Sequence, residues 1–244
     1  MPEAVIVAGA RTPIGKAPRG VFSRTRADEL AAVAIREVLA RAAGLDPAEV
    51  EDVILGCAQP EAEQGMNVAR VAAVRAGLPV QVPAMTVNRF CSSGLQAVAL
   101  AAQRIQTGEI EVAVAGGVES MSRVPMGGFK PSPNPWLMAH YPQLYMAMGH
   151  TAEEVARRWG ISREQQDRWA LESHRRAAAA TAEGRFSEEM VPVTVREVAE
   201  GPDGRPVAGE RAVTADEGIR RDTSLEKLAS LAPAFREGGT VTAG

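Results

Sequence analysis

The sequence predicts an α/β domain built around a mostly parallel sheet. Up to residue 117, short apolar runs alternate with longer stretches of helical period, and a chain of 244 residues that is 45% hydrophobic is long enough to bury a sizeable core. The expected strands are 4–8, 51–57, 83–90 and 111–116, and the expected helices between them are 27–43, 65–77 and 91–107. This βαβαβαβ order places helices on both faces of the sheet and functional loops at the carboxyl ends of its strands.

A second region is expected after residue 117. The segment 127–143 holds four prolines, which neither a sheet nor a long helix tolerates, so we expect a domain edge here. A capping-box pattern then occurs twice, which predicts helices that begin at Thr151 and Ser162. The predicted helices are 151–159 and 162–182, and the predicted strands are 191–198 and 211–214, joined by a turn-rich segment at 200–209.

The composition disfavours several classes of protein. The net charge of −3 results from 27 basic and 30 acidic residues that are mixed along the chain, so no basic patch for nucleic acid is expected. The two cysteines and three histidines lack the spacing of metal ligands, so we expect no metal site. No apolar run is long enough to cross a membrane and the amino terminus lacks the pattern of a secretion signal, which predicts a cytoplasmic protein without a membrane partner.

Cys91 occupies the most reactive position in the sequence, between an apolar strand and a helix. A thiol at the first turn of a helix faces unpaired backbone N–H groups and the positive end of the helix dipole, which favour the nucleophilic thiolate. The following helix is apolar nearly all round, so we expect it to be buried on most sides. Ser92 and Ser93 are expected to cap it, and Gly94 to leave room for a substrate. From the residues alone, a buried and inert cysteine explains the pattern equally well.

Six segments, in the same order along the chain, resemble the thiolase family. The segment VNRFCSSGLQA at 87–97 resembles the nucleophile motif of thiolases. The other five are AGARTPIGK at 8–16, GCAQPEAEQGMNVAR at 56–70, AGGVESMSRVP at 115–125, MGHTAEEVARRWGISREQQD at 148–167 and PAFREGGTVTAG at 233–244. Within the second of these, PEAEQG resembles the degradative 3-ketoacyl-CoA thiolases more than the acetoacetyl-forming branch.

The resemblance implies a layered α/β/α/β/α fold and a division into domains. Residues 1–117 would form the α/β domain that bears the nucleophile, and residues 118–239 an inserted loop domain for coenzyme A (CoA). Residues 240–244 would begin a strand that returns to the first domain. The second, related thiolase domain would be absent from this chain.

The resemblance also implies acyl transfer through a cysteine thioester. The Cys91 thiolate would attack the keto carbonyl of a 3-ketoacyl-CoA, acetyl-CoA would leave, and a second CoA would collect the shortened acyl group; the reverse reaction is a Claisen condensation. CoA is then a substrate, no cofactor is bound, and the family context is fatty acid β-oxidation by homodimers or homotetramers. Two other classes stay open, namely a non-catalytic protein that binds acyl-CoA or lipid, and a condensing enzyme of the ketoacyl-synthase type.

Five further positions match substrate-contacting residues of the family. Met148 matches a methionine that lines the acyl pocket, Arg220 and Lys227 match the region that contacts the nucleotide end of CoA, and Phe235 and Ala243 match residues that border the pantetheine arm. Each also has an ordinary explanation, because methionine and phenylalanine are common core residues and charged side chains are commonly solvated.

The chain also departs from the family pattern. The glycine-histidine-proline motif, the second catalytic cysteine and the asparagine of the oxyanion hole would all lie beyond Gly244, so we expect this chain to be inactive alone, as a fragment of a longer protein or a truncated product. Cys57 does not match the second cysteine and is expected to serve packing. Glu119, which follows two glycines at the end of a strand, is expected to lie in an ordinary turn.

Overall fold

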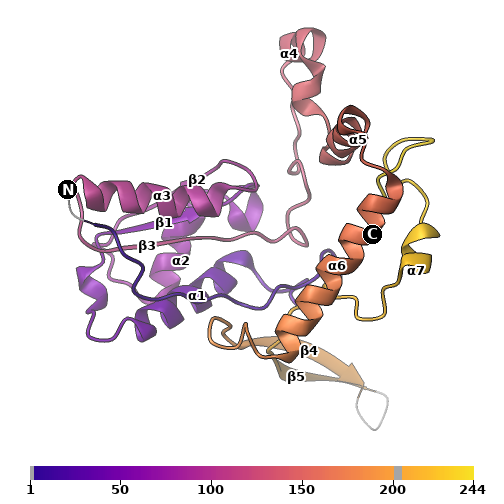
Figure 1. Ribbon diagram of the computed structural model, residues 1–244. Helices are drawn as coiled ribbons and strands as arrows, with labels where there is room; N and C mark the ends of the chain where they lie inside the picture. The colour runs from indigo at the N-terminus through magenta and orange to yellow at the C-terminus, as the bar shows by residue number, and fades with distance from the viewer. Residues whose placement is uncertain (1–2, 201–204) are drawn as a thin grey trace. The chain divides into compact units, whose positions relative to one another are not determined.

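The computed structural model describes residues 3–200 and 205–244, which divide into two compact units (Figure 1). The first unit comprises Met1–Lys130 and Ser187–Gly218, and the second comprises Pro131–Phe186 and Ile219–Gly244. The first unit holds all the strands labelled in Figure 1 together with α1, α2 and α3, and the second unit is helical.

The first unit contains a parallel sheet of three strands. They are β1 (Asp52–Gly56), β2 (Ala84–Val87) and β3 (Ala113–Gly117), in the spatial order β2-β1-β3. Both neighbours run parallel to β1, and Ile54 lies opposite Met85 on one side and Ala115 on the other. All residues of β1 are buried, as expected for a central strand whose two faces are both covered. Three of the four expected strands are therefore confirmed.

Helices cover both faces of this sheet (Figure 1). The helices of the unit are α1 (Ala27–Arg41), α2 (Val68–Ala76) and α3 (Ser93–Gln106), with 3-10 turns at Pro47–Glu49 and Ala62–Gln64. Val53 and Leu55 share a core with α1 and α2, whereas Ile54 packs against Ala97 of α3. Successive side chains of a strand point to opposite faces, so this division follows from the pleat of β1. The predicted α/β class is confirmed.

Helix α3 is less buried than its composition suggested. Only Ser93, Ala97 and Ala101 are buried, whereas Leu95 is 73% exposed and Val98 is 37% exposed. The expectation that α3 is enclosed on most sides is therefore wrong for the residues that the structure describes. The physical reason is that a single stripe of small residues contacts the sheet, while the apolar residues of the opposite face find no covering element within these residues.

The two ends of the chain also differ from expectation. The predicted strand 4–8 is an extended segment that pairs with no strand among the described residues, and Val5, Ile6 and Val7 are each more than two-thirds exposed. The predicted strand start at 240–244 likewise has no strand structure. Both corrections have the same cause, because an apolar run becomes a strand only where a neighbouring strand satisfies its backbone groups.

A β-hairpin completes the first unit. Its strands β4 (Val193–Glu200) and β5 (Pro206–Val213) are antiparallel, and the middle of the predicted turn, 201–204, lies outside the described residues. Val193 and Val213 are buried in a cluster with Phe22. This packing joins the hairpin to the first unit, and residues 118–130 belong to the same unit. The compact units therefore divide the chain differently from the predicted domains 1–117 and 118–239.

The second unit is built from α4 (Pro135–His140), a 3-10 turn (Pro142–Tyr145), α5 (Met148–Trp159), α6 (Arg163–Ala182) and α7 (Leu225–Ala229). The capping box of Ser162 and Gln165 is present, which confirms the predicted start of α6. The predicted start of α5 at Thr151 is wrong, because the Thr151 N–H donates to the Ala147 carbonyl inside the first helical turn. None of the helices in the described ranges is long and apolar enough to cross a bilayer.

Candidate functional site

Cys91 lies at the edge of the sheet where its parallel strands end. Strand β2 stops at Val87, a short loop follows, and α3 begins at Ser93 with Ser92 as its N-cap residue. The Cys91 side chain is a free thiol and is exposed. The strand-to-helix position predicted for this residue is therefore confirmed, and the thiol is exposed rather than buried. Its catalytic role stays a prediction.

The loop that carries Cys91 is held in an unusual backbone conformation. Phe90 has a φ of 47°, in the left-handed region that residues other than glycine rarely adopt. The Asn88 side chain accepts a hydrogen bond from the Phe90 N–H at 2.8 Å. On the other side, the Ser93 hydroxyl accepts from the Arg89 N–H at 2.8 Å and donates to the Phe90 carbonyl at 2.6 Å. These bonds fix the peptide groups on both sides of Phe90, directly before Cys91.

The two serines after Cys91 do not cap the helix in the expected way. The Ser92 hydroxyl donates to the Arg89 carbonyl at 3.1 Å, and no side-chain cap is present at this helix start. The Ser93 hydroxyl accepts from Arg89, which lies outside the helix. The predicted capping is wrong, because both hydroxyls are engaged with the loop. As a consequence, no serine side chain competes for the N–H groups of the first turn of α3.

Three glycines bring the first turn of α3 directly against the strands. A Cβ atom on Gly56 would lie only 2.2 Å from the Ser93 carbonyl carbon, and one on Gly117 would lie 3.3 Å from the Gly94 Cα. Gly56 ends β1 and Gly117 ends β3, so the backbone of α3 packs on the carboxyl ends of two strands. The absence of side chains here sets the position of the helix start and therefore of Cys91.

A polar network lies beside this helix start, around Cys57 and Glu119. The Glu119 carboxylate accepts from the Ala58 N–H and from the Gln64 amide, each at 2.6 Å. Gln64 is fully buried and also donates to the Gln59 carbonyl. Cys57 is buried, and burial together with the charge of Glu119 raises the pKa of its thiol to about 11. The Cys57 thiol is therefore unsuited to nucleophilic attack at neutral pH.

The other predicted site residues lie in the second unit. Met148 begins α5 and is 71% exposed, and Phe235 packs on the same helix turn, where its ring meets His150 edge-on at 6.3 Å between centroids. A Cβ atom on Gly149 would lie 2.1 Å from the Phe235 ring, so only glycine allows this approach. The structure therefore brings Met148 and Phe235 to one place, although they are far apart in sequence.

The remaining three residues predicted to contact CoA are all exposed. Arg220 is exposed, and its backbone N–H donates to the His174 ring at 3.2 Å. Lys227 forms an ion pair with Asp222 at 2.7 Å, which fits the ordinary explanation of a solvated charge. Ala243 is exposed near the end of the chain. Their assignment to CoA stays a prediction.

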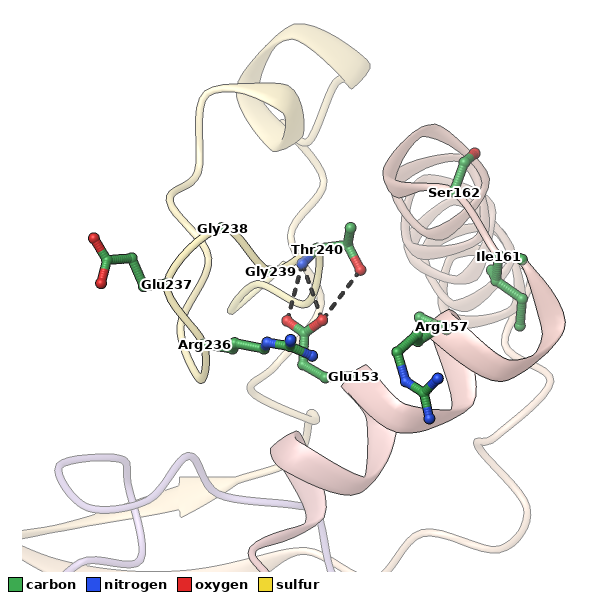
Figure 2. A pocket seen from close by; sticks show the side chains of 11 residues that line it. Glu153, Arg157, Ile161, Ser162, Arg236, Glu237, Gly238, Gly239 and Thr240 are labelled. Atoms are coloured by element: carbon green, nitrogen blue, oxygen red, sulfur yellow. Dashed lines mark hydrogen bonds between the residues drawn. The ribbon is translucent and has the colours of Figure 1, made fainter.

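Glu153 of α5 holds the segment that follows Phe235 (Figure 2). Its carboxylate is 5% exposed and accepts from the Val241 N–H at 2.8 Å and the Thr240 N–H at 2.9 Å. These backbone donors lower the pKa of Glu153, because they stabilise the charged form. An open pocket of about 420 Å³ adjoins this contact and is lined by the end of α5, residues 160–162 and residues 236–240.

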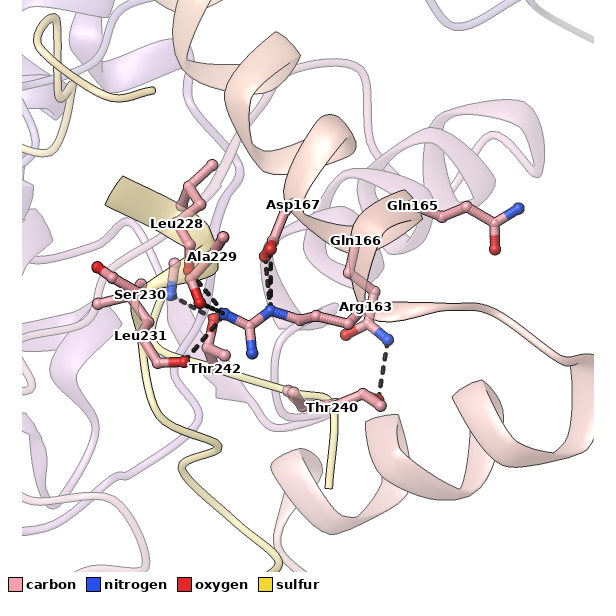
Figure 3. Close-up of polar contacts among 12 residues, drawn as sticks. Arg163, Gln165, Gln166, Asp167, Leu228, Ala229, Ser230, Leu231, Thr240 and Thr242 are labelled. Carbon is pink, nitrogen blue, oxygen red and sulfur yellow. Dashed lines mark hydrogen bonds and ion pairs between the residues drawn. The ribbon is translucent and has the colours of Figure 1, made fainter. Parts of the chain in front are cut away.

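Arg163 of α6 holds the backbone that precedes Phe235 (Figure 3). Its guanidinium donates to the carbonyls of Leu228 and Leu231 at 2.6 and 2.9 Å and pairs with Asp167 at 2.9 Å. Gln166, on the same helix, donates to the Thr240 hydroxyl at 3.0 Å. We call Glu153, Arg163 and Gln166 the clamp. It fixes an irregular stretch of backbone that carries Phe235.

Sequence reasoning missed the residues that hold these loops. Glu119 was expected in an ordinary turn and instead joins two loops, while Asn88, Glu153 and Arg163 were not singled out. The available signal was weak, because a polar residue in a loop or on a helix gives no indication of a partner far away in sequence. No cluster of three or more possible metal ligands occurs among the residues that the structure describes.

Comparison with known proteins decides the family. The family model "Thiolase, N-terminal domain" matches residues 4–244. The chain belongs to the thiolase family. It is 52% identical to a 3-ketoacyl-CoA thiolase of Bacillus subtilis over all of its length and 62% of that protein, and 45% identical to a 3-ketoacyl-CoA thiolase of Shewanella loihica, of which it covers 61%. The thiolase resemblance read from the six segments is therefore confirmed.

A solved thiolase-family structure confirms the fold. The crystal structure of the Bacillus anthracis acetyl-CoA acetyltransferase superposes with a TM-score of 0.83 at 38% identity, over 99% of this chain and 61% of that one. The chain thus spans about three-fifths of the length of the relatives it matches. Within this thiolase region, the loop with Cys91 and the segment with Phe235 are the two places where the predicted site residues and the observed geometry coincide.

Proposed function

We propose that the full-length protein is an acyltransferase that cleaves 3-ketoacyl-CoA with a second molecule of CoA, giving acetyl-CoA and a shortened acyl-CoA. The observation that carries this proposal is the exposed thiol of Cys91 on a constrained loop between β2 and α3. The relatives named 3-ketoacyl-CoA thiolase, which match the chain over its whole length, support the same reaction. Cleavage and condensation are the two directions of one equilibrium.

In this proposal the Cys91 sulfur attacks the keto carbonyl carbon of the substrate. The bond between the α and β carbons then breaks, acetyl-CoA leaves as an enolate that takes up a proton, and the acyl group stays on Cys91 as a thioester. The sulfur of a second CoA attacks this thioester, which releases the shortened acyl-CoA and regenerates the thiolate. Cysteine suits both steps because it is a strong nucleophile and a good leaving group.

The start of α3 supports this chemistry electrostatically. Each attack places negative charge on a carbonyl oxygen, and preorganised backbone N–H groups stabilise such charge. The N–H groups of the first turn of α3 lie directly after Cys91, and no side-chain cap engages them. We propose that they contribute to binding the oxyanion.

CoA is proposed as a substrate and not as a resident cofactor. We propose that Met148 and Phe235 border the acyl and pantetheine groups, with Ala243, Arg220 and Lys227 further along the CoA molecule. The contact of Phe235 with the first turn of α5 supports the first part of this assignment. The exposed guanidinium of Arg220 is suited to a phosphate or to stacking on adenine.

We further propose that the enzyme acts in fatty acid β-oxidation in the cytoplasm as a homodimer or homotetramer, without a metal, a nucleic acid or a membrane partner. The exposed apolar side chains of Ile6 and Leu95 support burial in a larger assembly, since apolar surface of this kind marks interaction sites.

A thiolysis assay tests the reaction. The full-length protein should convert 3-ketoacyl-CoA and CoA to acetyl-CoA, measured by chromatography of the CoA esters. Cys91→Ala should lower kcat by about a thousandfold or more, and Cys57→Ala, the matched control on the buried thiol, should keep it within about twofold. Absence of acetyl-CoA with the wild-type protein, or full activity of Cys91→Ala, would refute the proposal.

A further inference from the structure

A continuous run of hydrogen bonds joins Glu119 to the loop of Cys91. Glu119 Oε2 accepts from the Ala58 N–H at 2.6 Å, and the Ala58 carbonyl accepts from Asn88 Nδ2 at 3.1 Å. Asn88 Oδ1 in turn accepts from the Phe90 N–H at 2.8 Å. This relay links Glu119, two residues after β3, with the loop after β1 and with Phe90, which immediately precedes Cys91 in the loop after β2.

The far end of the relay is anchored in the core. The side chain of Gln64 is fully buried, and its two amide protons and its oxygen are all engaged. They contact the Gln59 carbonyl, the Glu119 carboxylate and the Ser120 N–H. A buried amide with every group satisfied is a rigid support, because any movement leaves a polar atom without a partner. Glu119 is exposed to solvent, but Gln64 fixes its carboxylate in place.

The near end of the relay holds a strained residue. Phe90 needs support in the left-handed region, since its Cβ disfavours that conformation. Asn88 holds the N–H of Phe90 and Ser93 holds its carbonyl, so both peptide groups of the strained residue are fixed. The direction in which the chain enters Cys91 depends on this conformation. Without Asn88, Phe90 can relax to an extended conformation and turn Cys91 away.

We propose that Asn88 and Glu119 are positioning residues that keep Cys91 in its reactive orientation by acting through the Phe90 peptide. This role deepens the proposed function and rests on it, because the reactive orientation is the one in which Cys91 attacks the substrate. The orientation itself is measurable without any substrate, through the rate at which iodoacetamide alkylates Cys91.

The test compares single and double variants of the full-length protein. Asn88→Ala and Glu119→Ala should each lower kcat and the Cys91 alkylation rate by about tenfold or more, because misplacing a reacting group by about 1 Å costs up to a hundredfold. KM for CoA should change by less than about twofold. Since the two residues belong to one relay, the double variant should lose no more than the larger single loss.

Conservative variants and a matched control distinguish a positioning effect from a general loss of folding. Asn88→Asp keeps an acceptor for the Phe90 N–H but loses the donor to the Ala58 carbonyl, so it should recover only part of the alkylation rate. Glu119→Gln keeps one acceptor and should lose less than Glu119→Ala. Asn67→Ala is the matched control. Asn67 also makes three side-chain hydrogen bonds in the first unit, to Ala84, Arg70 and Thr86, but none to the Cys91 loop. It should lower the melting temperature and leave kcat and alkylation of the folded protein unchanged.

The outcomes separate this proposal from the proposed function. Slower alkylation in Asn88→Ala without thiolysis by the wild-type protein would support the positioning role and refute the reaction. Normal thiolysis with Asn88→Ala and Glu119→Ala behaving like Asn67→Ala would overturn the positioning role alone. Additive losses in the double variant would also overturn it, because they would show two independent effects.

Discussion

The start of α3, directly after Cys91, and the segment that carries Phe235 are held in place by opposite means. The start of α3 is placed by the absence of side chains at Gly56 and Gly117, which lets backbone rest on backbone. The segment with Phe235 is placed by charged side chains of the clamp, Glu153 and Arg163, which bind its N–H and C=O groups. Adding a side chain at these glycines should therefore disrupt the start of α3, whereas removing a side chain of the clamp should disrupt the segment with Phe235.

The difference follows from the neighbours of each region. The start of α3 follows directly on the strands, whose backbone groups are already paired, so close packing of backbone on backbone sets the position of the helix start. The short loop before it is fixed by the side chains of Asn88 and Ser93. The segment after α7 has no regular partner among the described residues, and its buried carbonyl and N–H groups need side chains as partners. Four predictions test this contrast, from the largest expected effect to the smallest.

Adding one methyl group should disrupt the first region. In Gly56→Ala the new Cβ would lie 2.2 Å from the backbone of Ser93. Backbone atoms cannot relieve this clash by a change of rotamer. We expect a loss of about 3 kcal/mol in the free energy of unfolding, or failure to fold. The measurement is chemical unfolding of the full-length protein.

Gly94→Ala is the control for this change. Its new Cβ would meet nothing closer than 3.7 Å, and alanine favours a helix over glycine. We expect its stability to stay within about 1 kcal/mol of wild type. Equal losses in both variants would show that backbone contact does not set the position of α3.

Removing one charged side chain should disrupt the second region. Arg163→Ala removes the donors to Leu228 and Leu231 and leaves the buried carboxylate of Asp167 without its partner. We expect a loss of about 2 kcal/mol.

The control lies on the same helix. Arg168 pairs with Glu164 at the same spacing of four residues, but both side chains are about two-thirds exposed or more. Arg168→Ala should cost less than about 0.5 kcal/mol. Thermal unfolding of both variants provides the comparison, and a loss in Arg168→Ala as large as that in Arg163→Ala would contradict the account of the clamp.

The contribution of Glu153 should depend on pH. Its pKa is lowered in the folded protein by the N–H groups of Val241 and Thr240, so its stabilising effect is present above the ordinary pKa of a glutamate, about 4.3. The effect is lost as the pH falls through the lowered value. The stability difference between wild type and Glu153→Gln should therefore be largest near neutral pH and should shrink below about pH 4. Unfolding curves across this range test it, and a difference that grows in acid would contradict the assignment.

The smallest effect concerns Cys57. Because burial and Glu119 raise the pKa of its thiol to about 11, iodoacetamide at neutral pH should modify Cys91 and spare Cys57 in the folded protein. Of these two cysteines, peptide mapping should find label on Cys91 alone before unfolding and on both after it. Label on Cys57 in the native protein would show that its site opens to solvent.

The central part of the fold was predictable because local pattern decides it. The runs at 51–57, 83–90 and 111–116 became β1, β2 and β3, since short apolar segments between helices have few other ways to be buried. The same logic failed at 4–8, where the apolar pattern is as clear but no neighbouring strand is present among the described residues. A strand forms only when it is hydrogen-bonded to a neighbouring strand, and the sequence of one segment does not reveal that neighbour.

In the candidate site, the position of Cys91 was predictable from the sequence, but the residues that support the site were not. Cys91 is marked by its place between a strand and a helix, which are both local features. Glu153 acts on a residue 87 positions later and Arg163 on one 65 positions later. No periodicity or spacing in the sequence encodes such a distance. Asn88 and Glu119 were missed for the same reason, because their relay crosses three strands.

The most direct test of the account is the covalent state of Cys91 during the reaction. The full-length protein is mixed with a 3-ketoacyl-CoA in the absence of free CoA, quenched in acid and analysed by intact mass and peptide mapping. The account predicts one acyl group per chain, on the peptide that contains Cys91, which free CoA removes. An unmodified Cys91 peptide, or an acyl group on a different residue, would contradict it.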